Sequence, residues 1–389
     1  MGVARLPALD GLRAVAALMV VMTHAAFLTG FGSTTGLFGR LLGRGDFGVS
    51  LFFALSGFLL YRLLLHELER TGRIGALGYF LRRFARVIPA YWITMIVLVL
   101  AGRPDIRDTV LHALGLQIYV ADSTIPAFGQ SWSIATELSF YLVLPGLVLG
   151  LAWFRRRSDR WPMRILVAAL LTTSLLGFVV EPALLGENVI LERWLPWRAP
   201  HFLVGMILAE AGTRADMPTS RWLRRAGDDS GACLAVAGAA YLASTTPLAG
   251  SLLLQPAHGA ELVLRTAFAT IFAGSLLLPL TLGGPSFWSR FLSVPFVRWL
   301  GVVSYGLFLW HLPVFEGLYA ITGAPFFRGG LVPLLVVGLP VSLLLAFLSH
   351  QFVELPAARL AARLTRGPRR THSDEQHATH AELQPPRPE

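Results

Sequence analysis

An arginine and a histidine stand within the first apolar segment of the chain, which runs from residue 9 to residue 27. Arg13 and His24 are eleven positions apart, so an α-helix would place both on one face, about 16 Å apart along its axis. Ionisable groups inside a membrane-spanning helix are costly and usually face protein or water, so they indicate a functional site. The histidine suits proton transfer and the arginine suits anion binding.

A carboxylate is expected at a depth similar to that of His24. The fourth apolar segment opens with QSWSIATELSFYLVLP, which places Glu137 a few residues inside its span. We expect Glu137 to pair with His24, because a carboxylate raises the basicity of a histidine and fixes the tautomer that a general base needs. The alternative is that each side chain only hydrogen-bonds a neighbouring helix.

A second arginine cluster opens the third apolar segment, in YFLRRFARVIPAYW. Arg83 and Arg86 are three positions apart and therefore share a helix face. Guanidinium groups bind phosphate through paired hydrogen bonds, so together with Arg13 these residues could hold a phosphorylated ligand. Anchoring of the helix end by positive charge is the alternative, and for Arg82 it is the interpretation that we prefer.

Further polar residues interrupt the apolar segments. Ser304, Tyr305 and His311 stand in WLGVVSYGLFLWHLPVF, where His311 is either a second acid, base or substrate contact or a structural histidine bonded to another helix. Ser56, in GVSLFFALSGFLL, suits the close helix packing that small residues permit in membranes. Glu354, in FVELP, is expected to end the last span as a cap or an arginine partner.

The composition is that of a polytopic membrane protein. Of 389 residues, 54% are hydrophobic and 14% are charged, and the mean hydropathy is +0.60, which lies outside the range of ordinary soluble proteins. The net charge of +10 would suit a nucleic-acid partner, but the arginines stand between apolar segments and in the tail, where membrane topology accounts for them. We therefore expect a lipid bilayer and no nucleic acid.

Several familiar catalytic motifs are missing from the sequence. It contains no G-x-S-x-G, no G-x-x-x-x-G-K-[ST] and no H-E-x-x-H, so hydrolase, ATPase and zinc-protease chemistry have no support. The single cysteine, Cys233, provides neither a disulfide framework nor a cysteine-based metal site. A cleaved signal peptide is the alternative for the first segment, but Asp10 and Arg13 interrupt it and many spans follow, so we expect a retained helix.

Ten apolar segments have the length of membrane spans. They cover residues 9–29, 47–65, 80–101, 131–153, 164–181, 199–213, 231–247, 261–282, 298–320 and 331–354. With the N-terminus in the cytoplasm, 22 arginines fall in cytoplasmic segments and seven in outer loops, so the positive-inside rule predicts an all-α membrane protein with both termini in the cytoplasm. Residues 110–120 are too few to span, and we expect an interfacial or re-entrant helix there.

One membrane domain is expected over residues 1–356. Residues 357–389 are expected to form an arginine-rich, disordered cytoplasmic tail, because they lack apolar periodicity. Three histidines in the tail, His372, His377 and His380, could bind a metal ion, but a solvated tail is the simpler interpretation.

Six stretches of the sequence, in this order, resemble the acyltransferase family 3 of integral membrane acyl-transfer proteins. They are LDGLRAVAALMVVMTH, GVSLFFALSGFLL, RRFARVIPAYW, QSWSIATELSFYLVLP, VSYGLFLWHLP and FVELP. The resemblance covers nearly the whole chain up to about residue 356. It implies ten helices and the transfer of an acyl group, commonly acetyl, from cytoplasmic acyl-coenzyme A to a hydroxyl of a carbohydrate. The family's functional residues match Arg13, His24, Arg83, Arg86, Trp132, Ser133 and Glu137 of this sequence.

Two positions depart from the family pattern. Ile88 stands where an aromatic residue is frequent, and Leu355 stands where a basic residue often follows the glutamate. These departures weaken any specific role for Glu354. Some family members carry a separate hydrolase-like domain; we find none in this sequence and expect acyl transfer to the acceptor within the membrane domain.

The resemblance implies that one end of the first helix binds the acyl donor and that acyl transfer takes place at the other end. The phosphates of acyl-coenzyme A would lie on Arg13, Arg83 and Arg86, and its pantetheine arm would carry the thioester about half a bilayer outward, to His24. His24, oriented by Glu137, would remove the proton of the acceptor hydroxyl or would itself accept the acyl group.

The remaining assignments are less specific. Asp10 and Tyr91 would support Arg13 and the coenzyme entrance. The acceptor could be an envelope polysaccharide, a glycolipid or a glycosylated secreted metabolite such as a macrolide. We expect no metal cofactor. Two other classes of function stay open: a proton-coupled transporter that uses His24, Glu137 and His311 as a relay, and a metal-dependent enzyme that uses the same three side chains.

Overall fold

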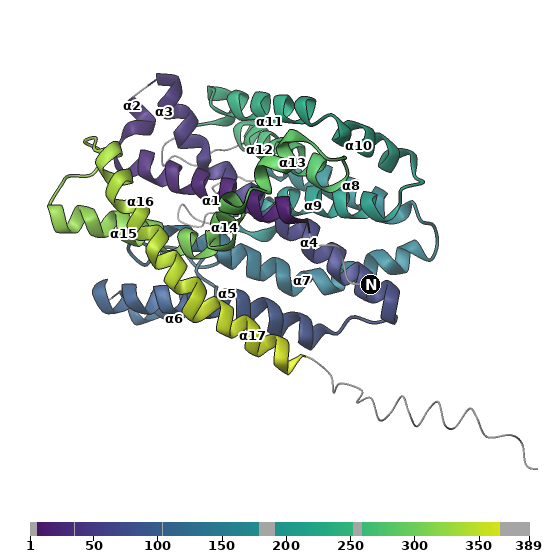
Figure 1. Ribbon diagram of the computed structural model, residues 1–389, viewed down its shortest axis with the longest axis horizontal. Coiled ribbons are helices and arrows are strands. Elements are labelled where there is room, and N and C mark those ends of the chain that lie inside the picture. The colour runs from purple at the N-terminus through teal and green to yellow at the C-terminus, as the bar shows by residue number, and fades with distance from the viewer. Residues whose placement is uncertain (1–5, 35, 103, 179–190, 252–258, 366–389) are drawn as a thin grey trace, which may run out of the picture.

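The computed structural model describes residues 6–34, 36–102, 104–178, 191–251 and 259–365, and every regular element in these ranges is helical (Figure 1). The α-helices are α1 (Pro7–Leu28), α2 (Phe31–Thr34), α3 (Gly36–Gly43), α4 (Phe47–Thr71), α5 (Ala76–Gly102), α6 (Ile106–Ala113), α7 (Trp132–Arg155), α8 (Trp161–Ser174), α9 (Leu195–Thr213), α10 (Pro218–Asp228), α11 (Ser230–Ser244), α12 (Gly259–Thr281), α13 (Phe287–Leu292), α14 (Pro295–Val302), α15 (Ser304–Thr322), α16 (Leu331–Ser349) and α17 (Leu355–Leu364). Short 3₁₀ turns include η1 (Arg44–Asp46), η2 (Gly129–Ser131) and η5 (Leu191–Arg193).

The predicted fold class is confirmed: the chain is an all-α polytopic membrane protein. Within the described ranges, six helical segments are long and apolar enough to cross a membrane, and they contain α1, α4, α5, α7, α12 and the run from α16 to α17. The other expected spans correspond to α8, α9, α11 and the α14–α15 region, which are shorter or less apolar. The count of ten spans and the side of each terminus stay predictions.

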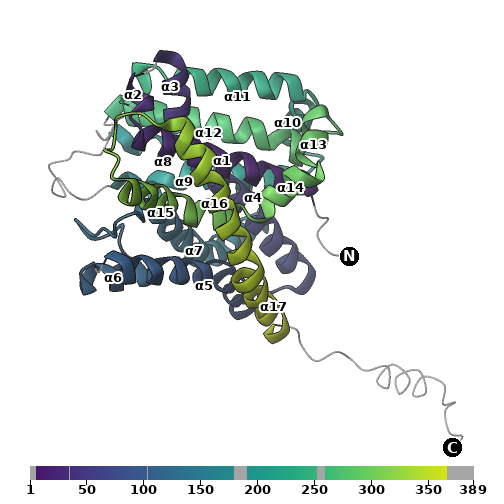
Figure 2. The same cartoon turned by 60° about the vertical axis from the view of Figure 1, so that its left-hand side comes forward.

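Helices α1 and α4 lie in the middle of the bundle, between α11 and α12 on one side and α5 on the other (Figures 1 and 2). Close approach of α4 to α9 depends on glycine. A Cβ atom at Gly57 would lie 2.1 Å from the carbonyl oxygen of Phe202, and one at Gly205 would lie 2.0 Å from that of Ala54. Small residues therefore let these two backbones touch, as in other membrane helix pairs.

The expected ninth span, residues 298–320, is not one helix. α14 ends at Val302 and α15 begins at Ser304, whose hydroxyl donates to the carbonyl of Gly301 at 2.8 Å. A Cβ atom at Gly301 would lie 1.7 Å from the carbonyl oxygen of Asp10. The break thus lets α14 pack directly on the first turns of α1, where Arg13 is located. The hydropathy of the sequence stays high across this break, so it does not reveal that the helix is interrupted.

The last span also differs from the expectation. A single turn of π-helix, His350–Glu354, joins α16 to α17, and the helix continues to Leu364. Glu354 therefore does not end the helix, and its polar contacts are with His350 Nδ1 at 3.3 Å and Ser349 Oγ at 3.5 Å. The expected domain boundary after Pro356 falls inside this helix. Residues 366–389, with the three tail histidines, lie outside the described residues.

The connection after α5 contains a helix, but earlier than the expected residues 110–120. α6 spans Ile106–Ala113 and is held on α5 by two side chains. The Tyr91 hydroxyl donates to the carbonyl of His112 at 2.9 Å, and the indole nitrogen of Trp92 donates to that of Ala113 at 3.0 Å.

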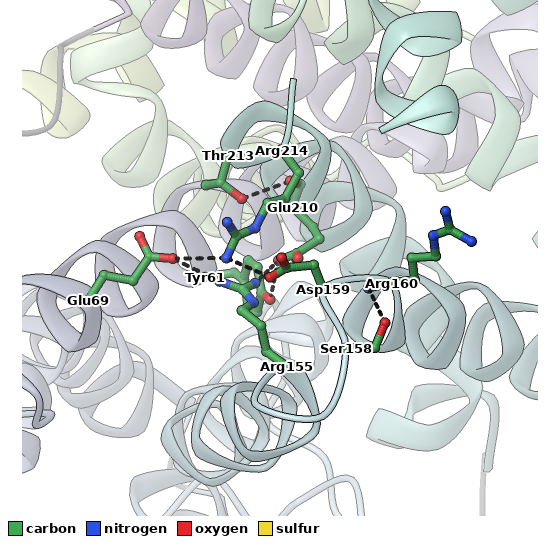
Figure 3. A network of polar contacts seen from close by, with 9 residues as sticks. All are labelled: Tyr61, Glu69, Arg155, Ser158, Asp159, Arg160, Glu210, Thr213 and Arg214. Atoms are coloured by element: carbon green, nitrogen blue, oxygen red, sulfur yellow. Dashed lines mark hydrogen bonds and ion pairs between the residues drawn. The ribbon is translucent and has the colours of Figure 1, made fainter. Parts of the chain in front are cut away.

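A group of charged side chains around the buried Glu210 joins the ends of α4, α7 and α9 (Figure 3). We call it the Glu210 cluster; it consists of Tyr61, Glu69, Arg155, Asp159, Glu210 and Arg214. Glu210 is fully buried and accepts hydrogen bonds from Arg155 Nη2 at 2.5 Å and from the Tyr61 hydroxyl at 2.7 Å. Arg155 Nη1 donates to Glu69 at 2.8 Å, and Arg214 pairs with Asp159 at 3.3 Å. The cluster ties three helices together.

Candidate active site

Arg13 and His24 both lie on α1, as expected, but they line two different cavities. The first, which we call the arginine cavity, has a volume of about 90 Å³. Its polar lining includes most of the site residues expected from the sequence: Arg13, Ser56, Arg83, Arg86, Ser133, Glu137, Ser304 and Tyr305. Tyr141, which was not expected, lines it too. Helices α1, α4, α5, α7 and α15 supply these side chains. Residues far apart in the sequence therefore meet as the arginine pattern predicts.

The arginines of this cavity differ in the ion pairs and hydrogen bonds that they form. Arg13 Nη1 donates to Asp10 Oδ1 at 3.0 Å, which is the contact expected between these residues. Arg83 and Arg86 form no ion pair with a carboxylate in the described part of the chain, and the buried Nε of Arg83 has no hydrogen-bond partner there. Arg86 is exposed, so the cavity has a charged mouth.

Glu137 lies in the arginine cavity, and its expected pairing with His24 is wrong. Its carboxylate accepts a hydrogen bond from the Ser56 hydroxyl and another from the Tyr141 hydroxyl at 2.8 Å. Arg13 lies within electrostatic reach of the same carboxylate. Similar depth in the membrane does not decide which faces of two helices meet, and here the Glu137 face of α7 meets the arginines.

The partner of His24 is another histidine. His24 Nδ1 lies 2.9 Å from the carbonyl oxygen of Val20 and 3.0 Å from His311 Nε2. His311 is fully buried, and its Nδ1 lies 3.0 Å from the carbonyl oxygen of Leu307.

These contacts determine where the protons of the neutral pair reside. A carbonyl oxygen only accepts, so His311 carries its proton on Nδ1 and presents the lone pair of Nε2 to His24. Both neighbours of His24 Nδ1 are then acceptors, which places the His24 proton on Nδ1. His24 Nε2 is left with a lone pair, which is the form that a general base requires.

His24 lines a second space, the histidine cavity, which has a volume of about 600 Å³. Its polar lining consists of Thr23, His24, Arg44, Asp46, Trp132, Arg193, Ser251, Arg265 and Glu316. Two non-glycine residues of its wall have left-handed backbones, Ala127 at φ 56° and Phe327 at φ 65°. Strained backbone of this kind concentrates at functional sites.

A smaller polar space of about 160 Å³ adjoins the histidine cavity, and we call it the side chamber. Asp46, Trp132, Arg193 and Arg265 line both spaces. Glu192, Arg198 and His201 line the side chamber alone. These charged residues, and Glu316 of the histidine cavity, were not predicted from the sequence. Arg265 and Glu316 nevertheless stand inside expected spans, which is the signal that singled out Arg13.

An aromatic side chain in the lining of the arginine cavity contacts the histidine pair. Phe308 lines the arginine cavity, and its ring centroid lies 6.1 Å from that of His311. Phe52 lines the same cavity and packs edge-on against Phe308 at 6.2 Å. We call these two residues the phenylalanine wall.

The remaining expected residues occupy different places. Trp132 lines the histidine cavity and the side chamber, with the Arg198 guanidinium 4.8 Å from its ring centroid. Ser133 Oγ donates to the carbonyl of Gln130 at 3.1 Å, and the Tyr305 hydroxyl donates to that of Val87 at 2.8 Å. Both hydrogen bonds fix the walls of the arginine cavity.

Tyr91 does not support Arg13 or the entrance of the arginine cavity. It lies five residues beyond Arg86, which is about 140° around the helix, so the two side chains point in different directions. Its hydroxyl instead bonds His112 and receives a hydrogen bond from Gln117 at 3.4 Å. The described residues also contain no group of three or more histidine, cysteine or acidic side chains that could hold a metal ion.

Comparison with known proteins agrees with the family resemblance. A family model described as an acyltransferase domain matches residues 6–350. The chain is 26% identical over 387 residues to the peptidoglycan O-acetyltransferase OatA of Listeria monocytogenes and 27% identical over 376 residues to the O-acetyltransferase OatA of Staphylococcus aureus. These matches cover 90% of the chain but only 55% and 57% of the relatives. The chain thus spans little more than half of their length. No solved structure matches.

Proposed function

Because the chain belongs to the acyltransferase family, we propose that it is a membrane O-acyltransferase that moves an acetyl group from acetyl-coenzyme A to a hydroxyl of a carbohydrate or glycosylated acceptor. The observation that carries the proposal is the division of α1 between two cavities, with an arginine cluster at one end and a histidine with a free Nε2 lone pair at the other.

The arginine cavity suits the donor. Three arginines face one carboxylate, Glu137, so the lining favours an anion. Pockets that enclose whole ligands usually have volumes of about 300–1,000 Å³, and the arginine cavity is far smaller. The phosphates of the coenzyme would therefore lie at the mouth, on Arg86 and Arg83, and only the slender pantetheine arm would enter. With the orientation predicted by the positive-inside rule, this mouth faces the cytoplasm.

The phenylalanine wall stands between the donor and the histidine pair. The thioester carbon must reach His24, so Phe308 and Phe52 have to move aside when the pantetheine arm enters. In the closed arrangement the wall keeps water in the histidine cavity away from the thioester, which limits its hydrolysis.

His24 is the proposed catalytic residue. Its Nε2 would take the proton of the acceptor hydroxyl as the oxygen attacks the thioester carbon, and the departing thiolate would take the proton back from Nε2. His311 positions this base, because its Nε2 accepts from His24 Nδ1 and holds the required tautomer. In the second route, Nε2 itself attacks the thioester carbon and expels coenzyme A as its thiolate. The acceptor hydroxyl then attacks the acyl-histidine, and its proton goes to the thiolate.

The histidine cavity suits the acceptor. Its volume of about 600 Å³ lies in the range of pockets that enclose a ligand, and His24 lies in its wall. The names of the Listeria and Staphylococcus relatives describe O-acetyltransferases, and the former acts on peptidoglycan. A saccharide hydroxyl is therefore the proposed acceptor group.

The test uses the purified full chain in proteoliposomes with radiolabelled acetyl-coenzyme A and a mixture of soluble cell-wall saccharides. We expect label to appear in saccharide esters and free coenzyme A to form at the same rate. His24→Ala should lower this rate at least a hundredfold, since general-base catalysis contributes about 10²–10⁴ in rate. The matched control is His66→Ala, since His66 is half-buried on α4 and lines none of the cavities.

Unchanged transfer in His24→Ala would contradict the role of His24. Proton-coupled movement of saccharide without consumption of acetyl-coenzyme A would instead support the transporter. The relay that this alternative requires is weakened by the position of Glu137, which lines the arginine cavity and bonds neither histidine. Label trapped on His24 in the absence of acceptor would identify the acyl-histidine route.

A further inference from the structure

We propose that the junction between the histidine cavity and the side chamber binds an acidic group of the acceptor, either a carboxylate or a phosphate. The inference rests on the proposed function, which gives the histidine cavity to the acceptor. It adds the chemical class of that acceptor, a saccharide with an anionic group near the hydroxyl that is acylated.

Arg193 is the central residue of this site, because it lines both spaces and has no acidic partner among the described residues. Its backbone carbonyl accepts a hydrogen bond from Thr136 Oγ1 at 2.5 Å, which anchors the end of η5 on α7. In the described ranges no carboxylate forms an ion pair with its guanidinium. The backbone of Arg193 is thus anchored beside the junction, and its guanidinium is available to an anion.

The neighbouring arginines are already paired, which singles out Arg193. Arg265 Nη2 lies 2.5 Å from Asp46 Oδ2, and Arg198 Nη2 lies 3.8 Å from Glu192 Oε1. Arg265 still lines the junction beside Arg193 and adds positive charge there.

Arg44 is a second buried cation in the wall of the histidine cavity. It is 1% exposed, and its Nη2 donates to the carbonyl of Gly250 at 3.2 Å. Its buried Nε has no hydrogen-bond partner among the described residues. A buried charge with so little compensation is costly, so an anion in the cavity would stabilise it.

Three polar atoms of the side chamber have no hydrogen-bond partner among the described residues, and they could bind the hydroxyl groups of a saccharide. Asp46 Oδ1 and Glu192 Oε2 are buried and lack donors in the described part of the chain, and His201 Nε2 lacks a partner there too. All three residues line the side chamber. Carboxylate oxygens accept from hydroxyl groups, so a sugar whose acidic group binds Arg193 would also satisfy these atoms.

The test measures equilibrium binding of three probes to the full chain in neutral phospholipid nanodiscs, by isothermal titration calorimetry. Methyl β-glucuronoside carries a carboxylate, methyl β-glucoside is its neutral counterpart, and glucose 1-phosphate carries a phosphate. We expect wild type to bind at least one anionic probe at least tenfold more tightly than the glucoside. Arg193→Gln should remove this preference, a loss of about ten- to hundredfold for a charged hydrogen bond.

Three further variants keep the test specific. Arg193→Lys retains the charge and should recover part of the preference, whereas Arg40→Gln, which changes an exposed arginine outside the cavities, should leave it intact. His24→Ala should also retain it, so that failure of the acyl-transfer proposal would be seen separately.

The outcomes decide between the sources of the anion. Tighter binding of the glucuronoside assigns a carboxylate, and tighter binding of glucose 1-phosphate assigns a phosphate. Equal affinity of all three probes for wild type, or an equal loss of all three in Arg193→Gln, would overturn the proposal.

Discussion

The Glu210 cluster and the arginine cavity both place charged side chains inside the helix bundle, but they balance those charges differently. In the Glu210 cluster, the buried carboxylate accepts from Arg155 and Tyr61, and Arg155 also reaches an outer glutamate. In the arginine cavity, Arg83 and Arg86 have no ion-pair partner in the described ranges. Charges that satisfy one another hold helices together, whereas charges left without partners are available to a ligand.

The largest expected effect is on stability, in the Glu210 cluster. Glu210→Ala leaves Arg155 in the bundle without its buried partner, and we expect the free energy of unfolding to fall by about 3–5 kcal/mol. Thermal unfolding of the detergent-purified protein measures the loss. Glu69→Gln is the control, because this glutamate is about half exposed and its ion pairs with Arg155 and Arg214 should each contribute about 1 kcal/mol or less. Equal losses in the two variants would contradict the account.

A smaller loss is expected when only the hydroxyl of the cluster is removed. Tyr61→Phe deletes a hydrogen bond of 2.7 Å to a buried carboxylate, and hydrogen bonds to charged groups contribute about 1.5–3 kcal/mol. The same unfolding measurement should show this intermediate value. Tyr119→Phe removes a hydroxyl that bonds Ser139 at 2.7 Å on an exposed side chain, and its effect should be clearly smaller. The reverse order would argue against tight packing of the cluster.

The smallest stability effect is expected in the arginine cavity. Arg83→Gln breaks no ion pair among the described residues and removes an uncompensated charge, so the free energy of unfolding should change by no more than about 0.5 kcal/mol or should rise. A loss comparable to that of Glu210→Ala would mean that Arg83 is structural and would remove the contrast between the two regions.

Much of the fold and of the arginine cavity could be predicted from the sequence. Hydropathy locates the helices because the bilayer demands long apolar segments. Arg13, Arg83 and Arg86 were found because ionisable residues are rare near such segments, and residues three apart on a helix share a face.

The partner of His24 could not be predicted in the same way. Hydropathy gives the depth of a residue but not the rotation of its helix, so Glu137 and His311 were both compatible with a contact to His24. The structure joins His24 to His311 because α15 packs on α1, and it turns Glu137 toward the arginines. Arg44 and Arg193 were missed because their short 3₁₀ turns look like ordinary loops in sequence.

The central claim, that Arg83 and Arg86 hold the phosphates of the donor, is tested most directly by the affinity for acetyl-coenzyme A. Isothermal titration calorimetry would compare wild type with Arg83→Gln and with Arg82→Gln, whose arginine is adjacent in sequence but does not line the cavity. We predict that Arg83→Gln weakens binding about ten- to hundredfold and that Arg82→Gln leaves it within about twofold, as expected for a residue outside the binding site. Equal affinity in wild type and Arg83→Gln would contradict the account.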